Sequence, residues 1–227
     1  MKLFVNGCSH TAGTIEALDG DFTQTWPNVL KRIGYDVKDI SFKGCSNDRI
    51  LRSTVDVILR DEYDFVIIQW TFPERFETPS PQNRAFKQHI PHAALNKYDG
   101  NPHLEFFKEY YYKSTETQEL LDTRFIHQLY SMQSILKLNK INYGFMIWMP
   151  IHKPLFRTSV WKQIDTDKIL NYRSGQIIGM DNILHDEGYK LSRKPIIGHE
   201  HLQDMHYMAD GHEHIARMVN DYIVRNT

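Results

Sequence analysis

The chain has 227 residues and a mass of 26.8 kDa, with 41% hydrophobic and 24% charged residues. This balance is typical of one globular domain and excludes a disordered chain, a collagen-like rod and a coiled coil. Lys and Arg number 27 against 28 Asp and Glu, so the net charge of -1 gives no general attraction for nucleic acid or an anionic membrane. No apolar run approaches the roughly 18 residues of a membrane span.

The amino-terminal apolar run is short and reaches Gly7 at once, which does not fit a secretory signal peptide. Two cysteines, Cys8 and Cys45, are too few for a secreted disulfide scaffold and indicate a reducing compartment. We therefore expect a cytoplasmic protein that works without a cofactor.

Strand and helix patterns alternate along the first 70 residues. Residues 64–70 form the clearest strand, because a nearly continuous apolar run is typical of a strand covered on both faces. The expected elements are a strand over 2–6, a helix from 25 to about 34, a strand over 37–40, a helix capped by Ser46 or Asn47, and a strand over 64–70.

Residues 72–114 interrupt this alternation with five prolines and an aromatic run, which predicts an insertion or lid within a single domain over 1–227. The alternation then resumes and favours an α/β fold with a mostly parallel sheet of about five strands and helices on both faces. The expected elements are a helix over 117–138, a strand over 143–149, helical segments near 165–170 and 181–186, and a closing helix over 209–224.

Ser9 lies in the segment Gly7-Cys8-Ser9-His10-Thr11-Ala12-Gly13, where the first strand ends. Functional sites of parallel sheets form at the carboxyl ends of the strands. A hydroxyl placed there can act as a nucleophile, and backbone N–H groups of the next turn can face a developing oxyanion. Gly-x-Ser is also a common turn composition, so this segment alone does not decide the role of Ser9.

Two further segments offer partners for Ser9. Gly44 follows the second strand, and a glycine there can present its N–H without a blocking side chain or simply satisfy a turn. His206 precedes the closing helix, and Asp204 lies two residues before it. A histidine can deprotonate a serine while a carboxylate orients the imidazole, although a histidine in this position can equally lie at the surface or cap the helix.

With these three segments, the chain resembles the SGNH (GDSL-like) hydrolases, a family of serine esterases with a flavodoxin-like α/β/α sheet. The segment over 7–13 resembles the opening Gly-Asp-Ser-x-Thr-x-Gly motif, and the segment over 206–212 resembles the His-Pro-Asn-x-x-Gly-His ending. The resemblance implies that Ser9 is the nucleophile, that His206 is the base, that Gly44 supplies an oxyanion N–H and that His212 is a structural residue.

Two departures concern the acid and the oxyanion hole. The family's usual spacing puts its acid three residues before the histidine, where this chain has Gln203, which has no carboxylate. We therefore favour Asp204, two residues before His206, as the acid. No asparagine follows the strand over 64–70, and Thr71 and Gln69 are the candidate replacements as third oxyanion donor.

The segment over 70–77 is similar to that of small SGNH-like proteins often encoded by bacteriophages, in which Trp-Thr-x-x-x-Arg replaces the asparagine motif. Arg75 can hold an anionic or polar substrate group, or it can pair with an acid nearby. Our candidates for substrate binding are His10, Asn47, Trp70 and Arg75. The resemblance implies a small-molecule or carbohydrate ester as substrate, and a phage protein would work in the host cytoplasm or the virion.

Two other functions remain open. A metal-dependent hydrolase can use the histidine-rich carboxyl-terminal region, although it contains no compact ligand motif such as His-Glu-x-x-His; the candidate ligands are His199, His201, Asp204, His206 and His212. A non-catalytic glycan-binding or virion assembly module, or a homo-oligomer, can use the aromatic insertion for its contacts. We expect no nucleic-acid or membrane partner and no bound metal.

Overall fold

The computed structural model describes residues 1–80, 85–89, 115–150, 156, 158–197 and 199–227. Its centre is a parallel four-stranded sheet, which confirms the expected α/β fold. The strands are, in spatial order, β2 (Asp36–Asp39), β1 (Lys2–Asn6), β3 (Phe65–Trp70) and β6 (Asn142–Ile147). The central pair, β1 and β3, is buried on both faces, as the continuous apolar run of β3 predicted.

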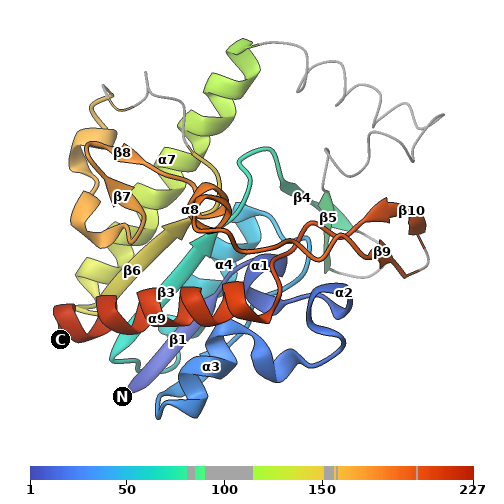
Figure 1. Ribbon diagram of the computed structural model, residues 1–227. Helices are drawn as coiled ribbons and strands as arrows, with labels where there is room; N and C mark the ends of the chain where they lie inside the picture. Colours follow the sequence, from blue (N-terminus) through green and yellow to red (C-terminus); the bar gives the residue numbers. More distant parts are fainter. Residues whose placement is uncertain (81–84, 90–114, 151–155, 157, 198) are drawn as a thin grey trace.

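Helices cover both faces of the sheet (Figure 1). Side chains alternate along a strand, so neighbouring residues of β3 enter different cores. Phe65 and Ile67 pack toward α3, α8 and α9, whereas Val66 and Ile68 pack toward α4 and α7. The helix bounds are α3 (Trp26–Arg32), α4 (Asn47–Ile58), α7 (Thr115–Leu138), α8 (Met180–Asp186) and α9 (Ala209–Asn226).

Of the two caps expected for α4, Ser46 and Asn47, the structure shows Ser46. The Ser46 side chain accepts a hydrogen bond of 3.2 Å from the backbone N–H of Arg49, which satisfies a donor that the first turn of α4 leaves free. Asn47 is then the first residue of α4. At α3, by contrast, the side chain of Thr25 does not cap the helix.

Short elements surround the sheet. The region over 72–114, expected to be an insertion or lid, contributes the antiparallel strands β4 and β5, and β4 contacts α4. Residues 81–84 and 90–114 lie outside the described ones. The remaining short elements are α1 (Ser9–Ala12), α2 (Ile15–Leu18), β4 (Phe76–Ser80), β5 (Ala85–His89), β7 (Tyr172–Arg173), β8 (Gln176–Ile177), β9 (Pro195–Ile196), β10 (His199–Gln203) and three 3-10 helices over 22–24, 161–163 and 166–168.

The second half of the chain differs from the expectation in two details. The sheet has four strands in the described residues rather than about five, because the segment outside β6 makes a single parallel bridge, from Ile169 to Phe145. The helical segment expected near 165–170 is only a 3-10 turn over 166–168. Successive tight turns here prevent the chain from extending alongside β6.

A glycine allows α9 to approach the sheet closely. A Cβ atom on Gly144 of β6 would lie 2.5 Å from Cε1 of Tyr222 and 2.8 Å from Cδ1 of Leu170. The Tyr222 hydroxyl donates a hydrogen bond of 3.0 Å to the carbonyl of Tyr143. The position therefore requires a residue without a side chain, and α9 is fixed against the amino-terminal half of β6.

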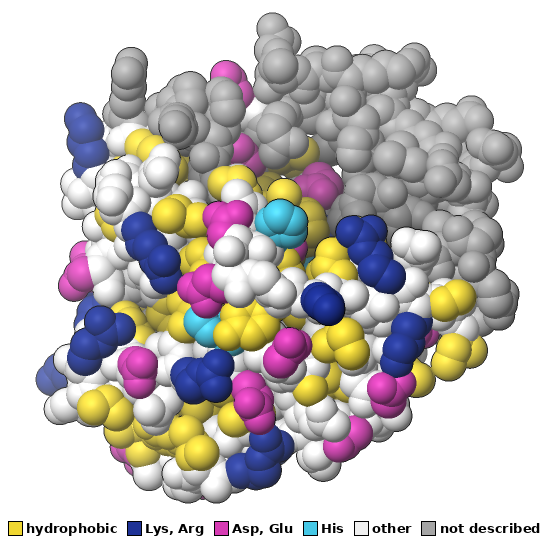
Figure 2. Space-filling model, viewed as in Figure 1, with side chains coloured by type: hydrophobic (Ala, Val, Ile, Leu, Met, Phe, Trp, Pro, Cys, Tyr) yellow, Lys and Arg dark blue, Asp and Glu magenta, His cyan; other side chains and the backbone are white. Residues whose placement is uncertain are grey.

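On the face in Figure 2, Lys and Arg side chains alternate with Asp and Glu over the described residues, without a broad area of one sign. None of the helices in the part of the chain that the structure describes combines the length and the apolar composition needed to cross a bilayer.

Candidate active site

The turn after β1 places Ser9 at the carboxyl end of the central strand. Asn6 is fully buried, and its side chain accepts a hydrogen bond of 2.9 Å from the N–H of Gly7 and donates to Thr54 of α4 (2.9 Å). A Cβ atom on Gly7 would collide with the Thr11 side chain, so only glycine fits the turn. Ser9 then begins α1, where its backbone N–H has no acceptor within the helix.

Ser9 meets a histidine from the other end of the chain. Nε2 of His206 lies 2.7 Å from Oγ of Ser9, and Nδ1 of the same ring lies 2.5 Å from Oδ1 of Asp204. Each distance is within hydrogen-bonding range. The structure thus aligns a hydroxyl, an imidazole and a carboxylate in the order that a nucleophile, its base and an orienting acid require.

Asp204 is held more firmly than Gln203, the residue at the family's usual acid position. Its side chain is 2% exposed, and its second oxygen accepts a hydrogen bond of 3.1 Å from Thr14. Its backbone N–H donates to the carbonyl of Lys194 (2.8 Å). Gln203 is exposed and carries an amide instead of a carboxylate. The acidic group that contacts His206 is therefore Asp204.

Aromatic rings form a wall beside this pair. His10 is 8% exposed and stacks on Trp148, with ring centroids 3.6 Å apart and planes inclined by 15°. The His10 ring also lies 4.4 Å from that of His206. Trp148 directly follows β6 and was not among our candidates; its position at the carboxyl end of a strand is the signal that could have found it.

The loop that contains Gly44 lies against the turn that contains Ser9. The thiol of Cys45 donates a hydrogen bond of 3.2 Å to the carbonyl of Gly7. Gly44 has φ +71°, in the left-handed region that favours glycine. The two segments that were expected to supply oxyanion donors are therefore neighbours.

Thr71 directly follows β3 and is clamped by Asn47. The Asn47 amide accepts from the N–H of Thr71 (2.9 Å) and donates to its carbonyl (3.1 Å). The Thr71 hydroxyl is buried and has no hydrogen-bond partner among the described residues. The other candidate third donor, Gln69, is occupied: its oxygen accepts from Thr11 (2.6 Å) and its amide donates to the Trp70 carbonyl (3.2 Å).

Two of the expected substrate-binding side chains lie behind the site. Asn47 is fully buried and engaged with Thr71. Trp70 is also fully buried, and its ring packs edge-on against Phe125 and Phe145 at centroid distances of 5.8 Å. In these positions both side chains support the site instead of facing solvent.

Arg75 is a buried cation near the site. Its side chain is 5% exposed, its guanidinium lies 4.6 Å from the Phe72 ring, and Nε and Nη1 have no hydrogen-bond acceptor among the described residues. A cation–π contact contributes about 0.5 to 2 kcal/mol, whereas burying a charge costs several kcal/mol. The ring contact therefore offsets only part of the cost.

The two cysteines are free and buried. Burial, reinforced by the nearby Cys8, raises the pKa of Cys45 to about 12, so this thiol stays protonated at neutral pH. Cys45 is thus a hydrogen-bond donor within the loop and not a nucleophile.

The described histidines of the carboxyl-terminal region have separate partners. His212 is 2% exposed, and its Nδ1 accepts a hydrogen bond of 3.3 Å from the backbone N–H of Trp26. Burial lowers the pKa of His212 to about 4, so the ring is neutral and supports α3, in agreement with the expected structural role. His214 contacts the Tyr189 hydroxyl (3.0 Å) and Glu187 (3.1 Å).

Within the described residues, no group of three or more His, Cys, Asp and Glu side chains could hold a metal ion. The side chains of His199 and His201 lie outside the described part of the chain.

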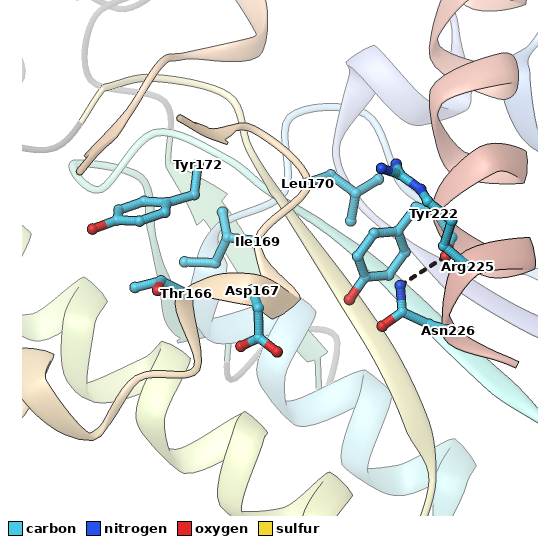
Figure 3. Close-up of a pocket in the computed structure, with 8 residues that line it drawn as sticks. All are labelled: Thr166, Asp167, Ile169, Leu170, Tyr172, Tyr222, Arg225 and Asn226. Atoms are coloured by element: carbon cyan, nitrogen blue, oxygen red, sulfur yellow. Dashed lines mark hydrogen bonds between the residues drawn. The ribbon is translucent and has the colours of Figure 1, made fainter. Parts of the chain in front are cut away.

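A cavity of about 470 Å³ lies elsewhere, between the end of α9 and the turns over 166–172 (Figure 3). Its walls include Tyr172, Tyr222 and Arg225, and none of the residues of the Ser9 site. Because Tyr222 bonds to the carbonyl of Tyr143, near the start of β6, this cavity is at the amino end of the strand. The converging reactive groups, and not the size of a cavity, identify the candidate active site.

No protein-family model and no curated protein matches the sequence. Solved structures do match. Axe2, an acetyl xylan esterase from Geobacillus stearothermophilus, has a TM-score of 0.50 and 16% identity, covering 98% of this chain and 94% of that one. A GDSL-like lipase from Bacteroides thetaiotaomicron has a TM-score of 0.50 and 12% identity over 100% and 89%, and TesA has 0.50 and 12% over 100% of both chains.

The protein has the flavodoxin-like fold of these hydrolases. At such low identity the likeness concerns the fold alone, and the chemistry must be argued from the site.

Proposed function

We propose that this protein is a serine ester hydrolase of the SGNH (GDSL-like) type. The observation that carries the proposal is the continuous line of hydrogen-bonding distances from Ser9 Oγ to His206 (2.7 Å) and from His206 to Asp204 (2.5 Å). Three residues from two distant parts of the chain meet at the carboxyl end of the sheet, where sites of parallel α/β folds form.

In this proposal Ser9 Oγ attacks the ester carbonyl while His206 Nε2 accepts its proton. Asp204 holds the imidazole through Nδ1 and stabilises the imidazolium that forms. The N–H groups of Ser9 and Gly44 and the hydroxyl of Thr71 stabilise the oxyanion. His206 then returns the proton to the leaving alcohol, and water hydrolyses the acyl-enzyme by the same route in reverse.

The proposed substrates are acyl esters, including O-acetylated carbohydrates. The support is the resemblance of residues 7–13 and 206–212 to the SGNH motifs, together with a fold shared with an acetyl xylan esterase and a GDSL-like lipase. Thr71 can replace the asparagine that supplies the third oxyanion donor in the SGNH family. Its hydroxyl is buried next to β3 and has no hydrogen-bond partner among the described residues.

Labelling with a fluorophosphonate probe tests the proposal. We expect one modified residue, Ser9, and hydrolysis of 4-nitrophenyl acetate that persists in a metal chelator. Ser9→Ala should abolish labelling and lower kcat by several orders of magnitude with the fold intact. Ser134→Ala is the matched control, because the hydroxyl of Ser134 is exposed and bonds only its own helix. A stably folded protein with neither labelling nor turnover would instead favour the non-catalytic binding module.

A further inference from the structure

Two of the three guanidinium nitrogens of Arg75 have no hydrogen-bond partner in the described part of the chain, although the residue is almost completely buried. Nε and Nη1 have no acceptor among the described residues, and only 5% of the residue is exposed. Buried polar atoms are nearly always hydrogen-bonded, and each exception requires a reason. Arginine cannot avoid the problem by losing its proton. The two free donors of this buried cation can therefore bind an anion.

Glu77 of β4 and Asp48 of α4 are already engaged with other side chains. Glu77 forms a two-pronged pair with Arg52, at 3.1 and 3.0 Å. Asp48 accepts a hydrogen bond of 2.7 Å from Gln128. No ion pair joins either of these two described carboxylates to Arg75.

The backbone of Arg75 is fixed. Its N–H donates to the carbonyl of Phe72 (3.2 Å), and its carbonyl accepts from Nη2 of Arg124 on α7 (3.0 Å). The ring of Phe72, 4.6 Å away, lies beneath the guanidinium. These contacts orient the cation before any ligand arrives, which is the arrangement that a binding site requires.

The same contacts connect Arg75 with the candidate active site. The ring of Phe72 lies 6.5 Å from that of His10, which lies 4.4 Å from that of His206. The positive charge of Arg75 also acts on the thiol of Cys45, the residue next to Gly44. Arg75 therefore lies near the rings of Phe72 and His10 and near the loop that contains Gly44 and Cys45.

We propose that Arg75 binds an anionic oxygen group of the substrate, so that the ester attacked by Ser9 carries a carboxylate on its acyl or its alcohol part. A planar guanidinium matches a carboxylate with paired, charge-assisted hydrogen bonds. The inference rests on the proposed function, and it narrows the substrate from esters in general to anionic esters.

Two matched pairs of esters test the inference on either side of the scissile bond. Mono-4-nitrophenyl succinate and 4-nitrophenyl butyrate differ by a carboxylate on the acyl part, whereas the acetyl esters of 3-hydroxybenzoate and 3-hydroxybenzamide differ by one on the alcohol. We expect at least tenfold higher kcat/KM for the anionic member of one pair, mainly through KM. Equal values in both pairs would overturn the inference.

Arg75→Gln should remove this preference by lowering kcat/KM for the anionic ester toward that of its neutral counterpart. Arg75→Lys should retain part of the preference, because it keeps the charge and loses the planar pair of donors. Arg60→Gln is the control, because Arg60 is exposed and its Nε donates to the carbonyl of Asp56 in α4. A preference that survives in Arg75→Gln, or disappears in Arg60→Gln instead, would contradict the role of Arg75.

The failure of this inference is distinguishable from failure of the proposed function. If fluorophosphonate labels Ser9 but the enzyme shows no preference for anionic esters, the anionic subsite is contradicted and the proposed esterase function is not. If no ester is hydrolysed, succinate binding measured by calorimetry decides: saturable binding that Arg75→Gln abolishes supports the subsite, and absence of binding overturns it.

Discussion

Thr14 donates a hydrogen bond of 3.1 Å to Oδ2 of Asp204, the carboxylate oxygen that His206 does not contact. The same hydroxyl accepts from the N–H of Ala17 at the start of α2. The Thr14 side chain therefore connects the first turn of α2 with the proposed acid, Asp204.

Replacing Thr14 with valine should lower kcat for a neutral ester about tenfold, because a hydrogen bond to a charged group contributes about 1.5 to 3 kcal/mol and part of it orients the acid. Thr14→Ser keeps the hydroxyl and should restore most of the rate. Steady-state kinetics on both variants provide the measurement. A rate that is retained in Thr14→Val and lost in Thr14→Ser would show that the methyl group, and not the hydroxyl, is what the site needs.

Asp204→Asn should lower kcat by roughly 10²- to 10⁴-fold without unfolding the protein, because the neutral amide neither stabilises the imidazolium nor enforces the tautomer. Gln203→Ala should behave like the wild type, since Gln203 is exposed. The two variants are compared in the same assay. A larger loss from the Gln203 substitution would reverse our choice of acid.

The neutral state of His212 predicts a loss of stability in acid. Its pKa falls from 6.5 in the unfolded chain to about 4 in the folded protein, so the unfolded chain binds the extra proton between these values. The free energy of unfolding should therefore decrease as the pH falls from about 6.5 to 4, by about 3 kcal/mol from this residue.

Urea unfolding at pH 7 and pH 5 measures this dependence. His212→Gln should be less stable than the wild type at pH 7 and should show a smaller difference between the two pH values. His185→Gln, at an exposed histidine, should keep the wild-type pH dependence. An unchanged slope in His212→Gln would mean that another group takes up the proton.

Arg75→Met should raise the free energy of unfolding or leave it unchanged, in contrast to most substitutions of buried residues. Replacing buried charges by apolar side chains is often neutral or stabilising by about 1 to 4 kcal/mol, and methionine preserves the apolar stem. Arg52→Met is the matched comparison, because it removes the ion pair of Arg52 with Glu77, whose side chain is 7% exposed. Urea unfolding should show a decrease for Arg52→Met only; equal decreases would mean that Arg75 is fully compensated in the free protein.

The sequence was informative where chemistry and periodicity are local. The apolar run of β3 predicted a strand buried on both faces, and Ser46 was identifiable as a cap. The four-residue helix α1 was not, because a single turn shows no periodicity. The missing fifth strand has a similar cause: the turns over 166–173 depend on packing against β6 rather than on a residue pattern.

The same distinction applies to the site. Ser9 and His206 stand in recognisable motifs, and the structure brings them together. Thr14 and Trp148 were missed because each acquires its role only through a partner far along the chain. Trp70 was expected at the substrate, yet its ring completes the core beside Phe125, as an alternating strand position dictates.

The hydrogen bond between His212 and Trp26 connects the last helix, α9, with α3 near the start of the chain. A ribosome delivers Ser9 almost immediately, whereas the groups that would take up its proton arrive about two hundred residues later. Until α9 docks on α3, an emerging chain would hold an inert alcohol and could not attack esters in its surroundings. Hydrolytic competence would therefore report completed folding, and the appearance of esterase signal in a translation reaction could serve as a clock for the docking of the carboxyl terminus.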